Sequence, residues 1–200
     1  MIALLVRHGQ TVSTREGRFL GSEDIPLDEV GMAQAAATRE AIAAFGPDAV
    51  IHSPMLRSCQ TLELLAPEGL ATHADERLTE VDFGNWEGLR PEEVAAADPD
   101  GKRRFDSGDM VRFPGGETSA EAALRVSAAI TAMVGQADHL LVVGHNTALR
   151  LGLAQLIGVE PRRYRRTLAT LRPCHWAEVR LSADSQAQLI SYNTNLVAPR

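Results

Sequence analysis

The chain has 200 residues, of which 44% are hydrophobic and 23% are charged, and its formal net charge is −6. This length suits one medium-sized domain with a buried core, and this composition is typical of globular rather than disordered proteins. The negative charge argues against nucleic acid or an anionic membrane as the main partner, and no apolar run is long enough to span a bilayer.

Strand and helix signals alternate along the first third of the chain. The apolar run 2–6 is typical of a strand buried on both faces. Asp28 is a good helix N-cap and Gly46-Pro47 is a stop signal, which predicts a helix from about 28 to 45. A second strand is expected over 49–52. Ser53 as N-cap, followed by Pro54, predicts a helix over 54–66.

The same alternation returns later in the chain. Thr118 and Glu121 have capping-box spacing and predict a helix to about residue 134. A strand over 140–143 and a helix over 148–156 follow. Two late strands are expected over 176–181 and 188–192.

The pattern as a whole predicts the architecture. Alternating strands and helices favour an α/β fold, a three-layer α/β/α sandwich with a mostly parallel central sheet. Residues 84–117 are rich in Gly, Pro, Asp and Arg, so we expect a small helical or loop cap insertion over the sheet's edge. A single domain over residues 1–200 holds all of these elements.

Polar segments directly follow three of the predicted strands. They are Arg7-His8, Ser53–Arg57 and Gly144-His145. In open α/β sheets, ligands bind at the carboxyl ends of the strands. We therefore expect these three segments to converge on one site.

The side chains in these segments suit a phosphoryl group. A neutral His8 imidazole can attack phosphorus while Arg7 holds phosphoryl oxygens with its guanidinium fork. Arg57 lies in the first turn of a predicted helix, where the macrodipole favours a bound anion. His145 can donate a further hydrogen bond to the phosphoryl group.

Phosphoryl transfer from an alcohol also needs a proton for the leaving oxygen, which a carboxylic acid can supply. Glu80, Asp82 and Glu87 are all candidates, and spacing alone does not choose among them.

Together these motifs resemble the histidine phosphatase superfamily, the fold group that includes phosphoglycerate mutases. The resemblance runs in the family's order from residue 2 to about 150. The matching motifs are Arg7-His8-Gly9 with Thr11, Gly17-Arg18 through Asp24-Ile25-Pro26-Leu27 and Gly31, Ser53–Arg57 with Gln60-Thr61, Glu80 with Gly84–Gly88, Pro114-Gly115-Gly116-Glu117, and Val143–His145.

The resemblance implies residue roles that the chemistry left open. His8 becomes the phosphohistidine, Arg7, Arg57 and His145 form the phosphate pocket, and Glu80 is the proton donor. The implied activity is metal-independent hydrolysis of a small organic phosphomonoester. Glu80 would protonate the leaving alkoxide and then deprotonate the attacking water.

Two other functions stay open. A phosphoglycerate mutase would share every core residue, but the short segment between Glu80 and His145 predicts a small cap that admits water and favours hydrolysis. A non-catalytic module that binds a phosphorylated ligand or a partner is the third interpretation, although the retention of His8 and Glu80 argues against it.

Substrate contacts are expected around this core. The predicted substrate-binding residues are Arg7, Gln10, Thr11, Arg18, Arg57, His145, Asn146 and Thr147. Two positions depart from the family pattern, because Asn146 stands where Gly is common and Thr14 where mutases often carry Asn. The apolar residues of the insertion either wall the substrate or pack the cap, and packing is favoured for most; they are Trp86, Phe105, Met110 and Phe113.

The remaining expectations concern cofactors, partners and compartment. We expect no metal or other cofactor, because Arg7 and Arg57 would crowd a cation and no zinc-ligand spacing occurs. The expected partner is a small phosphorylated metabolite, with neither nucleic acid nor a membrane, and a homodimer is compatible with the sequence. Two isolated cysteines and no signal-peptide pattern favour a cytoplasmic setting. The basic run 162–166 is predicted to be a solvated face.

Overall fold

A six-stranded sheet forms the middle of the molecule. The structure is a computed structural model that describes residues 1–183 and 185–195. The strand order is β3-β2-β4-β1-β5-β6, in which the first four strands are parallel, β5 is antiparallel to β1, and β6 is antiparallel to β5. The strands are β1 (Ile2–Arg7), β2 (Ala49–His52), β3 (Thr72–Ala74), β4 (His139–Gly144), β5 (Trp176–Ser182) and β6 (Ser185–Thr194).

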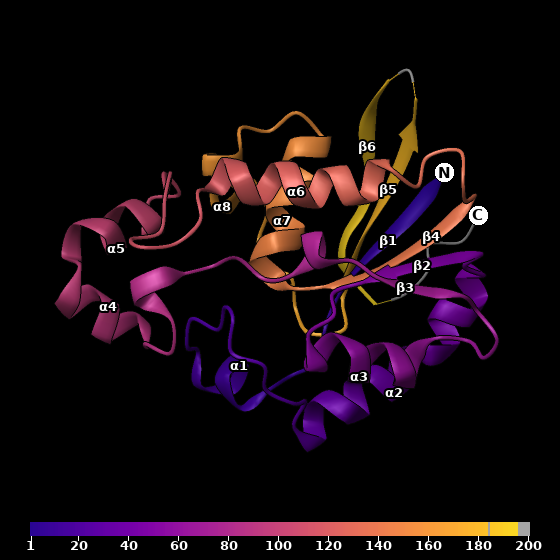
Figure 1. Cartoon of the computed structure of the whole chain (residues 1–200), viewed down its shortest axis with the longest axis horizontal. Helices are drawn as coiled ribbons and strands as arrows, with labels where there is room; N and C mark the ends of the chain where they lie inside the picture. Colours follow the sequence, from indigo (N-terminus) through magenta and orange to yellow (C-terminus); the bar gives the residue numbers. More distant parts are fainter. Residues whose placement is uncertain (184, 196–200) are drawn as a thin grey trace.

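Helices cover both faces of this sheet, with α2 and α3 below it and α6 and α7 above it in Figure 1. The helices are α1 (Val12–Glu16), α2 (Glu29–Phe45), α3 (Leu56–Leu65), α4 (Pro91–Ala97), α5 (Pro99–Asp106), α6 (Ser119–Thr131), α7 (Asn146–Leu156) and α8 (Tyr164–Thr167). This arrangement is the predicted α/β/α sandwich with a mostly parallel sheet. Within the described residues, no helix is both long enough and apolar enough to cross a membrane.

The central strand β1 is buried on both faces, as its continuous apolar run predicts. Ala3 and Leu5 belong to the core under α6 and α7, whereas Leu4 and Val6 belong to the core against α2 and α3. Side chains alternate between the faces because successive Cβ atoms of a strand point in opposite directions. Full burial of a Leu or Val side chain contributes roughly 1.5–3 kcal/mol, so β1 ties the two helical layers together.

The helix signals near the site are largely confirmed. Asp28 caps α2 by accepting the Gly31 N–H at 2.8 Å, and Gly46 ends the helix in the left-handed conformation at φ 66°. Thr118 and Glu121 form the predicted capping box. The helix that follows, α6, ends at Thr131, a few residues before the expected position.

The start of α3 differs from the prediction. The helix begins at Leu56 and its N-cap is Met55 rather than Ser53. The Ser53 hydroxyl accepts the Met55 N–H at 3.3 Å and lies 2.8 Å from His145 Nε2. The Leu56 N–H donates instead to Asp24 Oδ1 at 2.7 Å, from a loop distant in sequence. Arg57 still lies in the first turn, as predicted.

The cap segment 84–117 lies beyond the carboxyl ends of the strands, at the left of Figure 1, and carries α4 and α5. Its interior is an aromatic cluster whose ring centroids are 4.8 Å apart for Phe83–Phe113 and 6.1 Å apart for Phe105–Phe113. Trp86, Met110 and Phe113 are at most 2% exposed. These three side chains therefore pack the cap rather than wall a substrate. The single domain over residues 1–200 stays a prediction, and its last five residues lie outside the described part.

The turn after β1 rests directly on the first turn of α2. A Cβ atom at Gly9 would lie 2.5 Å from the Gly31 carbonyl oxygen, and one at Gly31 would lie 2.1 Å from the Gln10 carbonyl oxygen. The Asp28 N–H donates to that same Gln10 oxygen at 3.0 Å. Two glycines thus let the backbone that follows His8 contact the helix without intervening side chains.

We expect Gly31→Ala to lower the free energy of unfolding by about 1–3 kcal/mol, because the added methyl group must push the two backbones apart. In an open helical position the same change would stabilise by about 1 kcal/mol. Urea unfolding measures the difference. Val30→Ala is the matched control, since Val30 is 51% exposed on the same turn. A Gly31→Ala protein as stable as the wild type would contradict the close-contact interpretation.

Candidate active site

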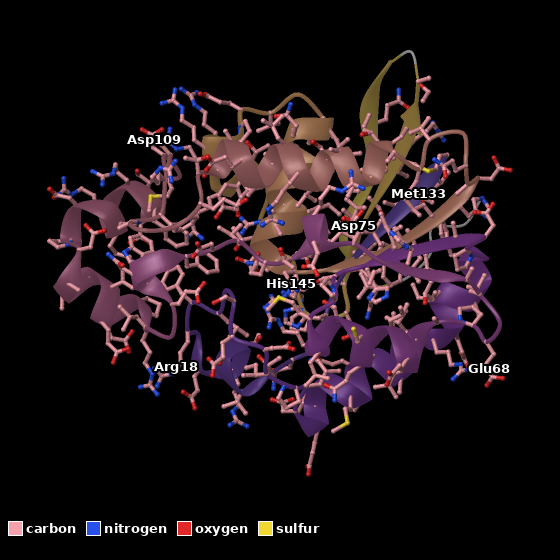
Figure 2. All side chains as sticks on the ribbon, in the orientation of Figure 1. Arg18, Glu68, Asp75, Asp109, Met133 and His145 are labelled. Carbon is pink, nitrogen blue, oxygen red and sulfur yellow. The ribbon has the colours of Figure 1, made fainter. Side chains whose placement is uncertain are left out.

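The carboxyl ends of β1 and β4 bring the two histidines together. Arg7 pairs with Gly144 across the parallel ladder, and the His8 N–H donates to the Gly144 carbonyl at 2.9 Å. The His8 and His145 rings lie with their centroids 5.1 Å apart. Figure 2 places His145 in the middle of the molecule, where the sheet ends. The predicted convergence of these segments is therefore present.

His8 is held in one tautomer. Its side chain is 3% exposed, and Nδ1 lies 2.6 Å from the Gly9 carbonyl oxygen. A carbonyl oxygen only accepts, so Nδ1 carries the hydrogen and Nε2 keeps its lone pair. Burial, followed by the charges of Arg7 and Arg57, holds the pKa of His8 well below its ordinary value of 6.5. The ring is therefore neutral at pH 7.

Arg57 connects His145 to the loop before α2. Its Nε donates to His145 Nδ1 at 3.1 Å, so the neutral His145 ring carries its hydrogen on Nε2, which faces the Ser53 hydroxyl. The two ends of the guanidinium donate to the carbonyls of Glu23 at 2.8 Å and Gly21 at 3.1 Å. Burial, then the nearby Arg57 charge, lowers the pKa of His145 well below 6.5.

Arg7 is positioned by a backbone bracket. Its Nη1 donates to the Leu171 carbonyl at 2.7 Å, and the Leu171 N–H donates to Asn146 Oδ1 at 3.1 Å. Burial lowers the pKa of Arg7 to about 10, so the group remains a cation at neutral pH. The predicted substrate contact Asn146 thus uses its carbonyl oxygen for the protein itself.

Glu80 lies at the N-terminus of α7. Its Oε1 accepts the N–H groups of Val81 at 2.9 Å and Ala148 at 2.8 Å, and its Oε2 accepts the Thr147 N–H at 3.1 Å. These three bonds fix the carboxylate in place. Oε2 accepts one N–H where Oε1 accepts two, so Oε2 has the larger spare hydrogen-bonding capacity.

Asp82 and Glu87, the other two acid candidates, are engaged elsewhere. Asp82 accepts the Gly84 N–H at 2.8 Å, and Glu87 accepts the Ser22 hydroxyl at 2.6 Å. Of the three carboxylates, Glu80 lines the same cavity as His8.

Arg7, His8 and Glu80 line a cavity of about 440 Å³. This volume is within the range of small-molecule sites. Arg7, His8 and Glu80 lie on the sheet side, and α5 closes the cap side. The cavity is lined by Arg7, His8, Thr14, Gly17, Arg18, Phe19, Leu20, Glu80, Phe83, Pro91, Lys102, Phe105, Asp106, Asn146, Thr147, Arg165 and Thr170. Arg165 corrects one expectation, because this member of the basic run faces the cavity rather than a solvated surface. Phe105 is the member of the predicted apolar wall that reaches it.

The residues that line this cavity do not include four of the predicted substrate contacts, namely Gln10, Thr11, Arg57 and His145. The Gln10 side chain donates to Asp28 Oδ2 at 3.1 Å, and Thr11 caps α1 by accepting the Thr14 N–H at 3.1 Å. Arg18 does line the cavity, with its Nε 2.8 Å from Glu16. Substrate roles for these residues stay predictions.

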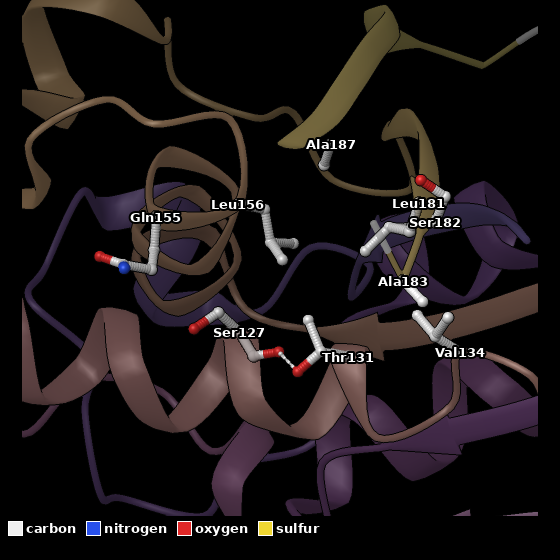
Figure 3. A pocket seen from close by; sticks show the side chains of 9 residues that line it. All are labelled: Ser127, Thr131, Val134, Gln155, Leu156, Leu181, Ser182, Ala183 and Ala187. Atoms are coloured by element: carbon white, nitrogen blue, oxygen red, sulfur yellow. Dashed lines mark hydrogen bonds between the residues drawn. The ribbon is translucent and has the colours of Figure 1, made fainter. Parts of the chain in front are cut away.

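Two larger cavities lack His8. One of about 500 Å³ on the other side of Glu80 is lined by Asp24, Glu76 and Asp82 among others, an acidic surface that repels phosphate. The other, of about 580 Å³, lies between α6, α7 and β5 (Figure 3), and its nine lining residues are uncharged. Neither competes with the arginine-lined cavity as a phosphate site. Among residues 1–183 and 185–195, no set of three His, Cys, Asp or Glu side chains is arranged to hold a metal ion.

Comparison with known proteins gives relatives in sequence that include proteins named as a mutase and as a phosphatase. A bifunctional protein of Mycobacterium tuberculosis is 35% identical over 153 residues, and the match spans 74% of this chain but only 42% of that protein. The "Probable phosphoglycerate mutase GpmB" of Proteus mirabilis is 32% identical, with 88% of this chain and 82% of that protein covered. "Phosphoserine phosphatase 1" of Hydrogenobacter thermophilus is 30% identical, with 78% and 76% covered.

Solved structures share the fold. The alpha-ribazole phosphatase of Shigella flexneri has a TM-score of 0.84 at 23% identity, with both chains fully covered. The mycobacterial glucosyl-3-phosphoglycerate phosphatase in complex with VO3 has a TM-score of 0.87 at 24% identity, covering 96% of this chain and 98% of that one.

The family description "Histidine phosphatase superfamily (branch 1)" matches residues 3–195, which is nearly the whole chain. This match agrees with the motif order, the sandwich fold and the paired histidines at the sheet end. The chain belongs to the histidine phosphatase superfamily.

Proposed function

We propose that the chain hydrolyses small organic phosphomonoesters through a phosphohistidine at His8 Nε2. The observation that carries the proposal is the 2.6 Å contact between His8 Nδ1 and the Gly9 carbonyl, which leaves Nε2 as the free nucleophilic nitrogen. His8 lines a cavity that is also lined by a buried cation, Arg7, and a carboxylate, Glu80. The relatives named as phosphatases support the same reaction class.

In the first step, the lone pair of His8 Nε2 attacks phosphorus and the bond from phosphorus to the ester oxygen breaks. Glu80, protonated on Oε2, gives its proton to the leaving oxygen, so the alcohol departs neutral. Arg7, Arg57 and His145 stabilise the charge on the transferring phosphoryl oxygens. Arg57 now donates to the carbonyls of Gly21 and Glu23, so its contact with phosphate requires an exchange of these partners.

In the second step, water attacks the phosphohistidine and the N–P bond breaks. The Glu80 carboxylate takes the proton from the attacking water, which restores both groups to their initial states. No step requires a metal ion, so we propose that the hydrolysis is metal-independent. The proposed substrate is a small phosphorylated metabolite, and the proposed compartment is the cytoplasm.

Phosphoglycerate mutase activity is the second candidate, favoured by the identity to the GpmB proteins. It would share the first step and differ in the acceptor, an alcohol in place of water. Turnover of 3-phosphoglycerate with a bisphosphoglycerate primer, monitored for 2-phosphoglycerate, separates the two reactions.

We expect His8→Ala to abolish phosphate release from p-nitrophenyl phosphate and from 3-phosphoglycerate, measured with EDTA present. The reason is that the covalent path loses its nucleophile. His73→Ala, an exposed histidine on the edge strand β3, is the matched control and should retain full activity. Trapping of an acid-labile phosphoryl group on wild type but not on His8→Ala would support the intermediate. Full activity in His8→Ala would exclude it.

We expect Glu80→Gln to slow the hydrolysis of alkyl phosphates about 100-fold or more. Hydrolysis of p-nitrophenyl phosphate should be slowed much less, because nitrophenolate leaves without a proton. Steady-state kcat/KM on both esters tests this. Glu76→Gln, an exposed carboxylate nearby, is the control. Because Glu80 also anchors α7, Tm is measured for each variant. Equal slowing of both esters would remove Glu80 from the role of leaving-group acid.

The neutral histidines also predict how stability depends on pH. Burial first, and the neighbouring arginine charges next, lower the folded-state pKa values of His8 and His145 below 6.5, so the unfolded chain binds more protons below that pH. The two histidines should therefore not reduce the free energy of unfolding above about pH 6.5. Below this pH they should reduce it by up to about 2.7 kcal/mol per pH unit. Urea unfolding across this range measures the slope. The double variant His8→Asn, His145→Asn should have a shallower slope than wild type, and an unchanged slope would refute the prediction.

A further inference from the structure

The cavity that holds His8 is much larger than a phosphoryl group, so its outer part must receive the rest of the ester. Four cationic side chains line it, namely Arg7, Arg18, Lys102 and Arg165. Two of them already have carboxylate partners, since Arg18 Nε lies 2.8 Å from Glu16 and Lys102 Nζ lies 2.5 Å from Asp106. Arg7 lies next to the nucleophile and serves the transferring phosphate.

Arg165 is the cation that remains. Within the described parts of the chain, no carboxylate oxygen lies within 4.0 Å of its guanidinium nitrogens, and its buried Nε has no hydrogen-bond partner. Its guanidinium carbon lies 3.8 Å from the centre of the Phe105 ring, so the group stacks on that ring. Stacking uses the face of the guanidinium; part of its N–H edge interacts with the Tyr164 hydroxyl, and the rest can donate to an anion.

The stacking partner fixes where Arg165 acts. Phe105 is on α5, and its ring contacts Phe19 and Trp86 at centroid distances of 5.2 Å and 5.6 Å. The ring is therefore part of the packed cap rather than a mobile side chain. Arg165 consequently lies on the cap side of the cavity, across from the strand ends that carry Arg7 and His8.

We infer that Arg165, stacked on Phe105, binds a second anionic group of the substrate and selects phosphomonoesters that carry a carboxylate or a second phosphate. The inference rests on the proposed hydrolysis at His8. No carboxylate partner in the described residues has to be displaced from Arg165 before an anion binds, and its planar fork suits both groups.

A matched pair of esters tests the inference. 3-Phosphoglycerate and glycerol 3-phosphate differ only in a carboxylate against a hydroxymethyl group, and fructose 1,6-bisphosphate against fructose 6-phosphate tests a second phosphate. We expect Arg165→Gln to lower kcat/KM about 10- to 100-fold for the doubly anionic member of the preferred pair, the loss of one charge-assisted contact. Glycerol 3-phosphate, fructose 6-phosphate and p-nitrophenyl phosphate should change less than about twofold. Arg165→Lys should recover part of the loss, and Arg163→Gln, an exposed neighbour paired with Glu160, should change nothing.

Each outcome decides the inference. Equal losses of kcat/KM on both members of a pair would mean that Arg165 binds the shared phosphoryl group or stabilises the fold of the cap. No loss of kcat/KM on any ester would mean that Arg165 does not contact the substrate. Either result would overturn the proposal. If wild type hydrolyses no ester, calorimetric binding of 3-phosphoglycerate and of fructose 1,6-bisphosphate to His8→Ala, each against its singly anionic partner, replaces the rate. A preference that Arg165→Gln abolishes there would support the subsite while the proposed hydrolysis fails. Absence of any such preference would overturn the subsite as well.

Discussion

The parallel pairing of β1 with β4 is the constraint on which the site depends. Both strands are buried on both faces, so their register is fixed by the packing of two helical layers. That register sets Arg7 opposite Gly144 and thereby sets His8 beside His145. The loops contribute the remaining groups, but each hydrogen-bonds back to these strand ends or to the helices that follow them. The precision of the site comes from the core rather than from the loops.

Buried positive charge is the second organising feature. Arg7 and Arg57 lose hydration in the folded protein, and this burial lowers the pKa of each. Neither lies within ion-pair distance of a carboxylate in the described residues. Such an arrangement costs stability, and the phosphate dianion of the proposed function would offset that cost for Arg7 and Arg57. Binding of the proposed phosphate ligand would therefore also stabilise the folded protein.

The sequence predicted what depends on local signals and strand ends. The sandwich, the cap of α2, the capping box of α6 and the meeting of the histidines follow from periodicity and capping chemistry. It predicted a helical or loop insertion over 84–117 without locating α4 and α5, although Pro91 and Asp98-Pro99 are N-terminal helix signals. The predicted start of α3 was wrong because Asp24, distant in sequence, accepts the Leu56 N–H at the first helical position. The place of Arg165 depends on tertiary stacking with Phe105, which no local pattern encodes.

The bracket of Arg7 and Asn146 on Leu171 has a consequence for how this chain tolerates change. Both hydrogen bonds use main-chain atoms of Leu171, so they depend on where the peptide unit lies and not on the identity of that side chain. Point substitutions at residue 171 that keep an apolar side chain preserve them. A one-residue insertion or deletion between α7 and residue 171 moves the peptide and disconnects both partners. The geometry around Arg7 therefore depends on the length of this segment more than on the identity of its side chains.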